Sequence, residues 1–279
     1  MIDIKDVTII IPHLGKSEES RYALGQCTAS LHETVPDMKK IVVVNGMVFD
    51  EKFDLYSCPE NTSIMTLQEQ GQCKAVNAAV ATTNTPWIFI TNDDMIYAPG
   101  WFEKLTENIG DKLCVSPQLV EPREGAPTFV EYFCGGAGGD FDKSKWIQYA
   151  YAHSLAGGHQ IRTGFNLPFL IKRELWDTIG GYDINYDPWG SNGDSDLEYK
   201  IRLAGVQPYQ NTNCVVYHFG QTSGTFHPDN RPYWQKNWDY FIEKWGFERE
   251  SAPKIWTADF DIPMDKLKLK PDWMGKYED

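Results

Sequence analysis

Short runs of β-branched and other apolar residues alternate along this chain with segments whose apolar residues recur at three- and four-residue spacing. The runs are typical of buried strands, and the spaced segments are typical of helices that bury one face. Their alternation predicts an α/β fold with a mostly parallel central sheet flanked by helices. We expect strands at residues 7–11, 40–44, 62–67, 87–90, 113–120, 165–171 and 214–217, and helices at residues 17–31, 73–81, 101–109, 173–178, 195–204 and 232–245.

A glycine cluster at residues 135–139 interrupts this alternation. Together with the aromatic-rich stretch that continues to Tyr151, it predicts an elaborated loop region. The cluster lacks the spacing G-x-G-x-x-G, and the pattern predicts no helix directly after it. A dinucleotide-binding fingerprint is therefore excluded here.

Composition narrows the class of ligand. The chain has 279 residues, 42% of them hydrophobic, which is enough to bury a core, and a formal net charge of −13. Such a charge repels phosphate backbones, so we expect no general nucleic-acid binding. An acidic protein that binds a phosphorylated small molecule needs a local device, such as a metal ion or a helix amino terminus.

The chain shows no membrane-spanning or secretory pattern. Its apolar runs are far shorter than the roughly 20 residues of a spanning helix, so no transmembrane segment is expected. The first residues are acidic and do not resemble a signal peptide. The 6 cysteines are scattered without a C-x-x-C pair, which favours reduced thiols and a cytoplasmic location.

Two adjacent carboxylates, Asp93 and Asp94, follow the predicted strand at residues 87–90. Ligands of open α/β sheets bind beyond the carboxyl ends of the strands. Adjacent carboxylates repel each other, so a partly buried pair needs a cation or hydrogen-bond donors. The alternative interpretation is that Asn92, Asp93 and Asp94 only form a turn before Pro99.

A second acidic segment, residues 189–198, leads into a predicted helix. Ser195 and Glu198 fit a capping box at the start of that helix. Asp194 lies just before the expected cap, so the helix does not need its carboxylate, which is free to act as a base or to be solvated. The nearby helix amino terminus should lower the pKa of Asp194.

A histidine, His218, follows the predicted strand at residues 214–217. A lone histidine is most often a packing or surface residue. Together with Asp94, however, it would supply the mixed oxygen and nitrogen ligands that suit Mn²⁺ and tolerate Mg²⁺.

In their order and spacing, these segments resemble the family 2 glycosyltransferases over residues 7–220. Residues 7–12 are similar to the opening strand V-x-I-I-I-P, and residues 71–77 to the helix before the D-x-D strand. Residues 92–94 resemble the D-x-D motif itself, and residues 193–197 resemble the motif E-D-x-D-L.

The resemblance implies a GT-A fold with a smaller acceptor-side region. The GT-A domain would span residues 1–225, with a nucleotide-binding half at residues 1–98 and an acceptor and catalytic half at residues 99–225. A loop and helical tail would occupy residues 226–279. The implied activity is inverting transfer of a sugar from a nucleotide-diphosphate sugar, UDP-sugar favoured, to a hydroxyl of a saccharide or other acceptor.

The resemblance also implies site residues. Asp94 and His218 would hold Mn²⁺ or Mg²⁺ against the donor diphosphate, and Asp194 would be the catalytic base. The donor would contact Pro12, Leu14, Asn45, Gln70, Lys74, Asn92 and Asp93. The acceptor would contact Trp189, Gly190 and Asp196, although a tryptophan such as Trp189 is more often a packing residue.

Three positions depart from the family pattern: Asn92 and Asn45 replace acidic residues, and Gly193 replaces glutamate. Asparagine still hydrogen-bonds a ribose or a base, without the charge. Three alternatives remain: a non-catalytic carbohydrate-binding protein, a retaining enzyme, and a sugar-nucleotide pyrophosphorylase. The last would carry a glycine-rich basic loop after the first strand, where residues 12–16 offer one glycine and one lysine.

Overall fold

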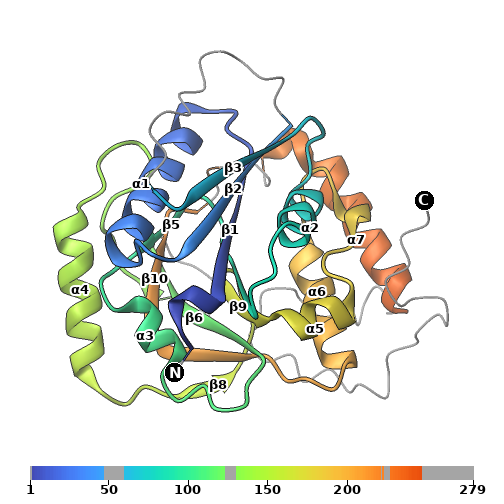
Figure 1. Cartoon of the computed structure of the whole chain (residues 1–279). Helices are drawn as coiled ribbons and strands as arrows, with labels where there is room; N and C mark the ends of the chain where they lie inside the picture. Colours follow the sequence, from blue (N-terminus) through green and yellow to red (C-terminus); the bar gives the residue numbers. More distant parts are fainter. Residues whose placement is uncertain (1, 47–59, 123–129, 221, 223–226, 247–279) are drawn as a thin grey trace.

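The computed structural model describes residues 2–46, 60–122, 130–220, 222 and 227–246. One mixed sheet runs through the molecule with helices on both of its faces (Figure 1). The predicted α/β architecture is confirmed. The part of the predicted tail beyond residue 246 lies outside the described residues.

The described strands form one ten-stranded sheet in the order β3-β2-β1-β4-β9-β6-β10-β5, with β7 beside β6 and β8 beside β10. The strands are β1 (Val7–His13), β2 (Lys39–Asn45), β3 (Thr62–Leu67), β4 (Trp87–Ile90), β5 (Met95–Tyr97), β6 (Cys114–Glu121), β7 (Val130–Glu131), β8 (Ile161–Thr163), β9 (Phe169–Lys172) and β10 (Tyr209–His218).

Strand direction decides where a site forms. β3, β2, β1 and β4 are parallel, whereas β9 is antiparallel to both β4 and β6. β6 therefore runs in the same direction as β4, and β10 is parallel to β6. The carboxyl ends of β1, β2, β4, β6 and β10 consequently share one edge of the sheet.

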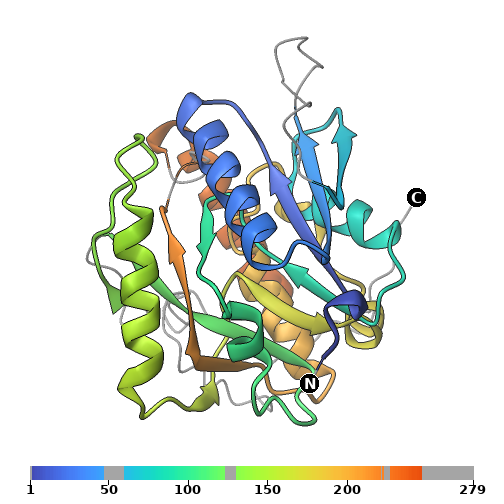
Figure 2. The ribbon, with the colours of Figure 1, turned by 60° about the vertical axis from the view of Figure 1, so that its left-hand side comes forward.

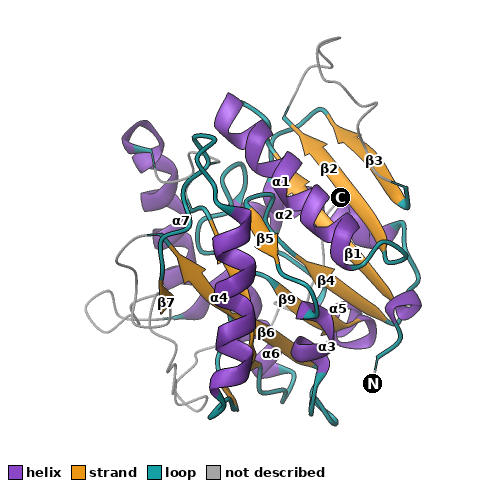
Figure 3. Ribbon diagram, turned by 90° about the vertical axis from the view of Figure 1, so that its left-hand side faces the viewer, coloured by secondary structure: helices purple, strands orange, loops and turns teal. Residues whose placement is uncertain are grey.

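The helices form two layers. One face carries α1, α3 and α4, and the other carries α2, α5, α6 and α7 (Figures 1 and 3). Their bounds are α1 (Glu18–Thr34), α2 (Gln72–Ala81), α3 (Trp101–Thr106), α4 (Lys143–Ala156), α5 (Arg173–Ile179), α6 (Gly193–Leu203) and α7 (Arg231–Trp245), with short 3₁₀ turns η1 (Ile4–Asp6), η3 (Ile184–Tyr186) and η4 (Pro228–Asn230).

The core explains the unbroken apolar run of β1. Ile9 and Ile11 pack on the side of α1 and α3, and Ile10 packs on the side of α2. All three side chains are fully buried because helices cover both faces of the sheet. Phe241 and Trp245 of α7 belong to the same core cluster as α2 and α6, so the beginning of the predicted tail packs on the main body.

The aromatic-rich stretch that we predicted as a loop forms α4 instead. Figure 2 shows this helix lying along the outside of the molecule. The side chain of Asp142 accepts a hydrogen bond from the backbone N–H of Lys145 and so caps its first turn. Trp146 and Ala150, four residues apart, are buried against the body. Residues 132–142, which include the glycine cluster, form the loop before α4.

Several other predicted elements have wrong boundaries. The strand predicted at residues 214–217 begins at Tyr209, and the helix predicted at residues 17–31 ends at Thr34. The strand predicted at residues 165–171 begins at Phe169, after the cis peptide bond between Leu167 and Pro168. The helix predicted at residues 101–109 ends at Thr106. The helix predicted at residues 195–204 begins at Gly193.

The structure tests the expectations about cysteines and membrane segments only within the described residues. Within them, no helix combines the length and apolar character needed to cross a membrane. The cysteines that the structure describes are buried free thiols: Cys27, Cys73, Cys114, Cys134 and Cys214.

Candidate active site

Polar side chains gather at the sheet edge where the parallel strands end. β1 ends at His13, β2 at Asn45, β6 at Glu121 and β10 at His218. The segment of residues 92–94 follows β4 at the same edge. The sequence predicted this edge as the ligand site, and the strand directions bring the predicted residues there.

Asp94 and His218 lie next to each other, as predicted. The antiparallel register places His218 opposite Met95, and Oδ1 of Asp94 is 3.3 Å from Nε2 of His218. On its other side, Nδ1 of His218 is 2.6 Å from Oε1 of Glu121. Glu121 is fully buried, and sequence analysis did not identify it.

The two neighbouring carboxylates determine the charge of the His218 imidazole. Burial alone lowers the pKa of His218, but the carboxylates of Asp94 and Glu121 outweigh it and raise the pKa to about 10. Burial likewise opposes the charge of Asp94, yet His218 and a hydrogen bond from Thr222 leave its pKa below the ordinary value. The imidazolium thus occupies a place between two carboxylates that suits a cation.

Asp93 turns to a different imidazole. Its Oδ2 is 2.5 Å from Nδ1 of His13, and both side chains are buried. Burial raises the pKa of Asp93 in spite of this partner. The two adjacent carboxylates are therefore tolerated because each has its own histidine. His13 was missed, although its place directly after Pro12 at a strand end was a usable signal.

Asn45 connects the strand ends to α2. Its side-chain amide donates to the carbonyl of His13 (3.0 Å) and its oxygen accepts from the backbone N–H of Gly71 (2.9 Å). A carboxylate could accept but not donate. This double role gives a physical reason for asparagine where the family pattern has an acid.

The first turn of α2 is capped from a distant part of the chain. Asp187 accepts hydrogen bonds from the backbone N–H groups of Cys73 and Lys74, both at 3.0 Å. A Cβ atom on Gly71 would lie 2.4 Å from Oδ2 of Asp187, so only glycine fits beside this cap. This contact could not be predicted from sequence because the cap comes from a distant loop, whereas caps usually come from neighbouring residues.

Two predicted donor-binding side chains have protein partners at this edge. Lys74 forms an ion pair with Glu69. Gln70 accepts a hydrogen bond from Lys16 at 2.5 Å, and Nζ of Lys16 lies 5.3 Å from the ring centre of Trp189. The loops after β1 and β3 thus meet the segment of residues 187–190.

The remaining predicted donor and acceptor residues line the same region. Pro12 and Leu14 are buried at the end of β1, and Asn92 is partly exposed. Oδ1 of Asn92 is 3.5 Å from Nε2 of Gln72. A Cβ atom on Gly190 would lie 3.0 Å from the side chain of Gln72. The first turn of α2 therefore stands between Asn92 and the predicted acceptor side.

Asp194 lies inside the first turn of α6, and our expectation for its pKa was wrong. Asn192, in the left-handed conformation, is the N-cap, so the predicted capping box does not form. Glu198 pairs with Arg202 instead. Burial raises the pKa of Asp194 to about 6, outweighing the hydrogen bond that it accepts from the hydroxyl of Tyr182 (2.7 Å). Desolvation here exceeds the effect of the helix amino terminus.

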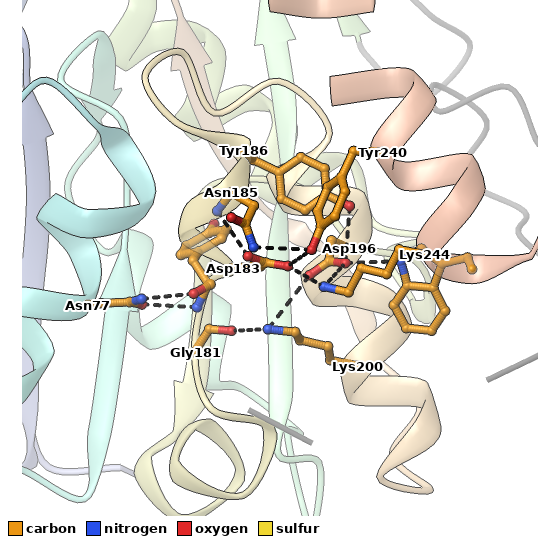
Figure 4. A network of polar contacts seen from close by, with 11 residues as sticks. Asn77, Gly181, Asp183, Asn185, Tyr186, Asp196, Lys200, Tyr240 and Lys244 are labelled. Carbon is orange, nitrogen blue, oxygen red and sulfur yellow. Dashed lines mark hydrogen bonds and ion pairs between the residues drawn. The ribbon is translucent and has the colours of Figure 1, made fainter. Parts of the chain in front are cut away.

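Asp196, predicted to bind the acceptor, belongs to the core instead. It is fully buried, and its Oδ1 is 2.7 Å from Nζ of Lys244 and 3.0 Å from Nε1 of Trp245. Nζ of Lys200 lies 3.6 Å from Oδ2. Figure 4 shows this buried network joining α6 to α7. Its carboxylate is enclosed by protein partners, which argues against a contact with the acceptor.

The described residues contain no cluster of three or more His, Cys, Asp or Glu side chains arranged to hold a metal ion. Asp94 and His218 form a pair, with Glu121 bonded to the far nitrogen of the imidazole. Any ion at this place would take its remaining ligands from outside these side chains.

Comparisons with known proteins agree with the geometry. The model of the family described as "Glycosyl transferase family 2" matches residues 8–172. A "Galactofuranosyl glycosyltransferase" of Leishmania donovani is 22% identical over 272 residues, which cover 82% of this chain and 56% of that protein. The chain thus spans little more than half the length of this relative.

Two solved structures show the fold. One, of GalNAc-T7 with UDP, GalNAc and Mn²⁺, has a TM-score of 0.53 at 15% identity and covers 76% of this chain and 43% of its own. The other is the mannosyltransferase PcManGT of Pyrobaculum calidifontis with GDP-Man and Mn²⁺, with a TM-score of 0.52 at 14% identity. That match covers 85% of this chain and 64% of the mannosyltransferase chain. The predicted GT-A fold is confirmed.

Proposed function

We propose, from the premise that this chain belongs to glycosyl transferase family 2, that it transfers a sugar from a nucleotide-diphosphate sugar to a hydroxyl group. The observation that carries the proposal is the sheet edge itself, where Asp94, His218 and Glu121 converge. Asp194 lies on the other side of the first turn of α2 from that edge. A cation-binding pair on one side and a carboxylate base on the other are the parts that glycosyl transfer requires.

The donor side supports a nucleoside diphosphate. The two solved neighbours bind UDP and GDP-Man, and UDP-sugar is our favoured donor. Pro12, Leu14, Gln70 and Asn92 stay the expected donor contacts. Asn45 and Asp93 are buried and hydrogen-bonded within the protein, so they support the donor through the shape of the edge. Lys74, whose ion pair with Glu69 is exposed, stays an expected donor contact.

The residues present fit a divalent ion. Nδ1 of His218 is fixed by Glu121, which directs Nε2 toward Asp94, the usual outer-shell arrangement of a metal-binding histidine. Apart from this contact with His218, the buried Oδ1 of Asp94 has no hydrogen-bond partner in the described part of the chain. Mn²⁺ or Mg²⁺ held by these two side chains would neutralise the departing diphosphate.

Asp194 is the proposed base of an inverting reaction. Its carboxylate takes the proton of the acceptor hydroxyl as that oxygen attacks the anomeric carbon, and the diphosphate leaves with the bonding electrons of the glycosidic bond. A pKa of about 6 keeps this carboxylate ionised at neutral pH while leaving it basic enough to accept the proton. Trp189 and Gly190 border the acceptor side.

Thermal unfolding with nucleotides and nucleotide sugars, with and without Mn²⁺, tests the proposal. We expect a uridine nucleotide with Mn²⁺ to raise Tm more than either alone, because binding stabilises the native state by about 2.7 kcal/mol at 100 times Kd. If no nucleotide raises Tm and no nucleotide sugar is hydrolysed, the protein is a non-catalytic member of the family. Anomeric NMR of the product separates inversion from retention.

Replacing Glu121 with Ala should weaken Mn²⁺ binding about 10- to 100-fold, because the imidazole loses the partner that orients it. Electron paramagnetic resonance of free Mn²⁺ in a titration measures the affinity. Glu131→Ala is the matched control, since Glu131 lies on the neighbouring strand β7 but is exposed. Equal Mn²⁺ affinity in both variants would remove Glu121 from the site.

A further inference from the structure

We propose that Tyr182 is a positioning residue, whose hydroxyl holds Oδ1 of Asp194 so that Oδ2 faces the acceptor hydroxyl. The inference rests on the proposed function of Asp194 as base. The hydroxyl of Tyr182 donates to Oδ1 of Asp194 at 2.7 Å. Tyr182 is 1% exposed, whereas Asp194 keeps part of its surface accessible. One carboxylate oxygen is thus bound inside the protein, which leaves the other for the acceptor hydroxyl.

Tyr182 is itself held at both ends of its backbone. The side-chain amide of Asn77 donates to the carbonyl of Tyr182 (2.8 Å), and its oxygen accepts from the N–H of Tyr182 (2.9 Å). Figure 4 shows Asn77 of α2 reaching this loop beside Gly181. The phenol ring also packs edge-on against Trp176, with centroids 5.7 Å apart. The hydroxyl is therefore fixed relative to α2 and α5.

The absence of a side chain at residue 193 belongs to the same arrangement. A Cβ atom on Gly193 would lie 3.2 Å from Sγ of Cys73 and 3.7 Å from Cδ1 of Tyr182. A glutamate at residue 193, as in the family pattern, would have to fit its side chain into the narrow space beside Cys73 and Tyr182. Glycine lets α6 begin directly against the phenol ring and brings Asp194 within hydrogen-bond distance of it.

The hydroxyl acts as a donor and does not exchange its proton with the base. Burial, followed by the charge of Asp194, raises the pKa of Tyr182 well above its ordinary value. The other titratable groups that act on this hydroxyl are the thiols of Cys73 from α2 and Cys114 from β6. Burial raises the pKa of both thiols above the ordinary value, with Asp187 and Asp194 adding to the effect on Cys73, so both stay neutral. The hydrogen bond from Tyr182 therefore favours the ionised form of Asp194 against its desolvation.

Tyr182→Phe tests the inference through the pH dependence of kcat/KM. Without the hydroxyl, the acid limb of the profile should move upward by about one pH unit, since a hydrogen bond to a charged group contributes about that much. Turnover should fall about tenfold at about pH 5, below both pKa values, and about twofold at about pH 7, where a carboxylate with a pKa near 7 is still half ionised, and KM for the donor should not change. An unchanged profile would overturn the positioning role.

Tyr240→Phe is the control. It removes a neighbouring hydroxyl that contacts Asp183 and Asn185 but not Asp194, so its profile should match that of the parent. If both variants shift alike, the effect is a general loosening of the loop and the inference fails. If Tyr182→Phe does not fold, Asn77→Asp, which keeps the acceptor for the N–H of Tyr182 but loses the donor to its carbonyl, should shift the acid limb in the same direction. No shift there also overturns the inference.

The failure of the inference is distinguishable from that of the proposed function. If Asp194→Asn is inactive and Tyr182→Phe keeps the parent profile, Asp194 is the base and Tyr182 does not position it. If Asp194→Asn keeps near-normal activity, the assignment of the base fails first.

Discussion

Asp194→Asn is expected to lower turnover by about 10²- to 10⁴-fold, the range that a positioned general base contributes, while the affinity for the donor stays nearly unchanged. The amide oxygen of Asn can still accept the hydrogen bond from Tyr182, so the surroundings of residue 194 should be kept. The amide cannot accept the proton of the acceptor hydroxyl. The loss should therefore appear in kcat and not in donor binding.

Steady-state kinetics and calorimetric titration of the donor nucleotide measure the two quantities separately. Asp229→Asn is a suitable control because the side chain of Asp229 is 88% exposed and lies outside the site. The parent enzyme should lose activity as the pH falls through about 6, where Asp194 takes up a proton. A rate for Asp194→Asn within a few fold of the parent would refute its role as base.

Asp94→Ala is expected to abolish the part of nucleotide binding that depends on Mn²⁺. Loss of an outer-shell partner weakens metal binding by about 10- to 100-fold, so loss of a direct ligand should exceed about 100-fold. The change also leaves His218 with Glu121 alone as its acidic partner. Calorimetric titration of the nucleotide with and without Mn²⁺ measures the effect.

Asp140→Ala serves as the control for Asp94→Ala, because Asp140 is exposed in the loop before α4. His218→Ala should reproduce the loss if both side chains hold the same ion. Mn²⁺-dependent affinity that survives in Asp94→Ala would mean that the ion, if one binds, lies elsewhere. Nucleotide binding that never depends on Mn²⁺, even in the parent, would remove the metal from the mechanism.

The strand ends could be predicted from sequence because they follow from local patterns. The apolar runs give the strands, and a parallel sheet puts their carboxyl ends together. Asp94 and His218 could thus be paired from sequence although Asp94 lies in the turn after β4 and His218 at the end of β10. The residues that contact the two aspartates and His218 could not be predicted in this way. Glu121 is 97 residues from His218 and His13 is 80 residues from Asp93, and no local rule connects such positions.

The errors on α6 have a related cause. A capping box is a local pattern, and Ser195 with Glu198 satisfies it. Arg202 competes for Glu198, and Asn192 starts the helix earlier in the left-handed conformation. The pKa of Asp194 and the burial of Asp196 depend on α2 and α7, which pack on α6 in the tertiary structure. Burial of this kind is not visible in the sequence of a single segment.

The buried network of Lys200, Lys244 and Asp196 has a practical consequence for handling this protein. The family match ends at residue 172, and a fragment trimmed to that limit would omit Asp194 and expose the apolar side of α2 to water. A fragment ending before Arg231 would remove Lys244 and leave Asp183 and Asp196 without that countercharge. Expression trials and crystallisation should therefore retain the polypeptide at least through Trp245.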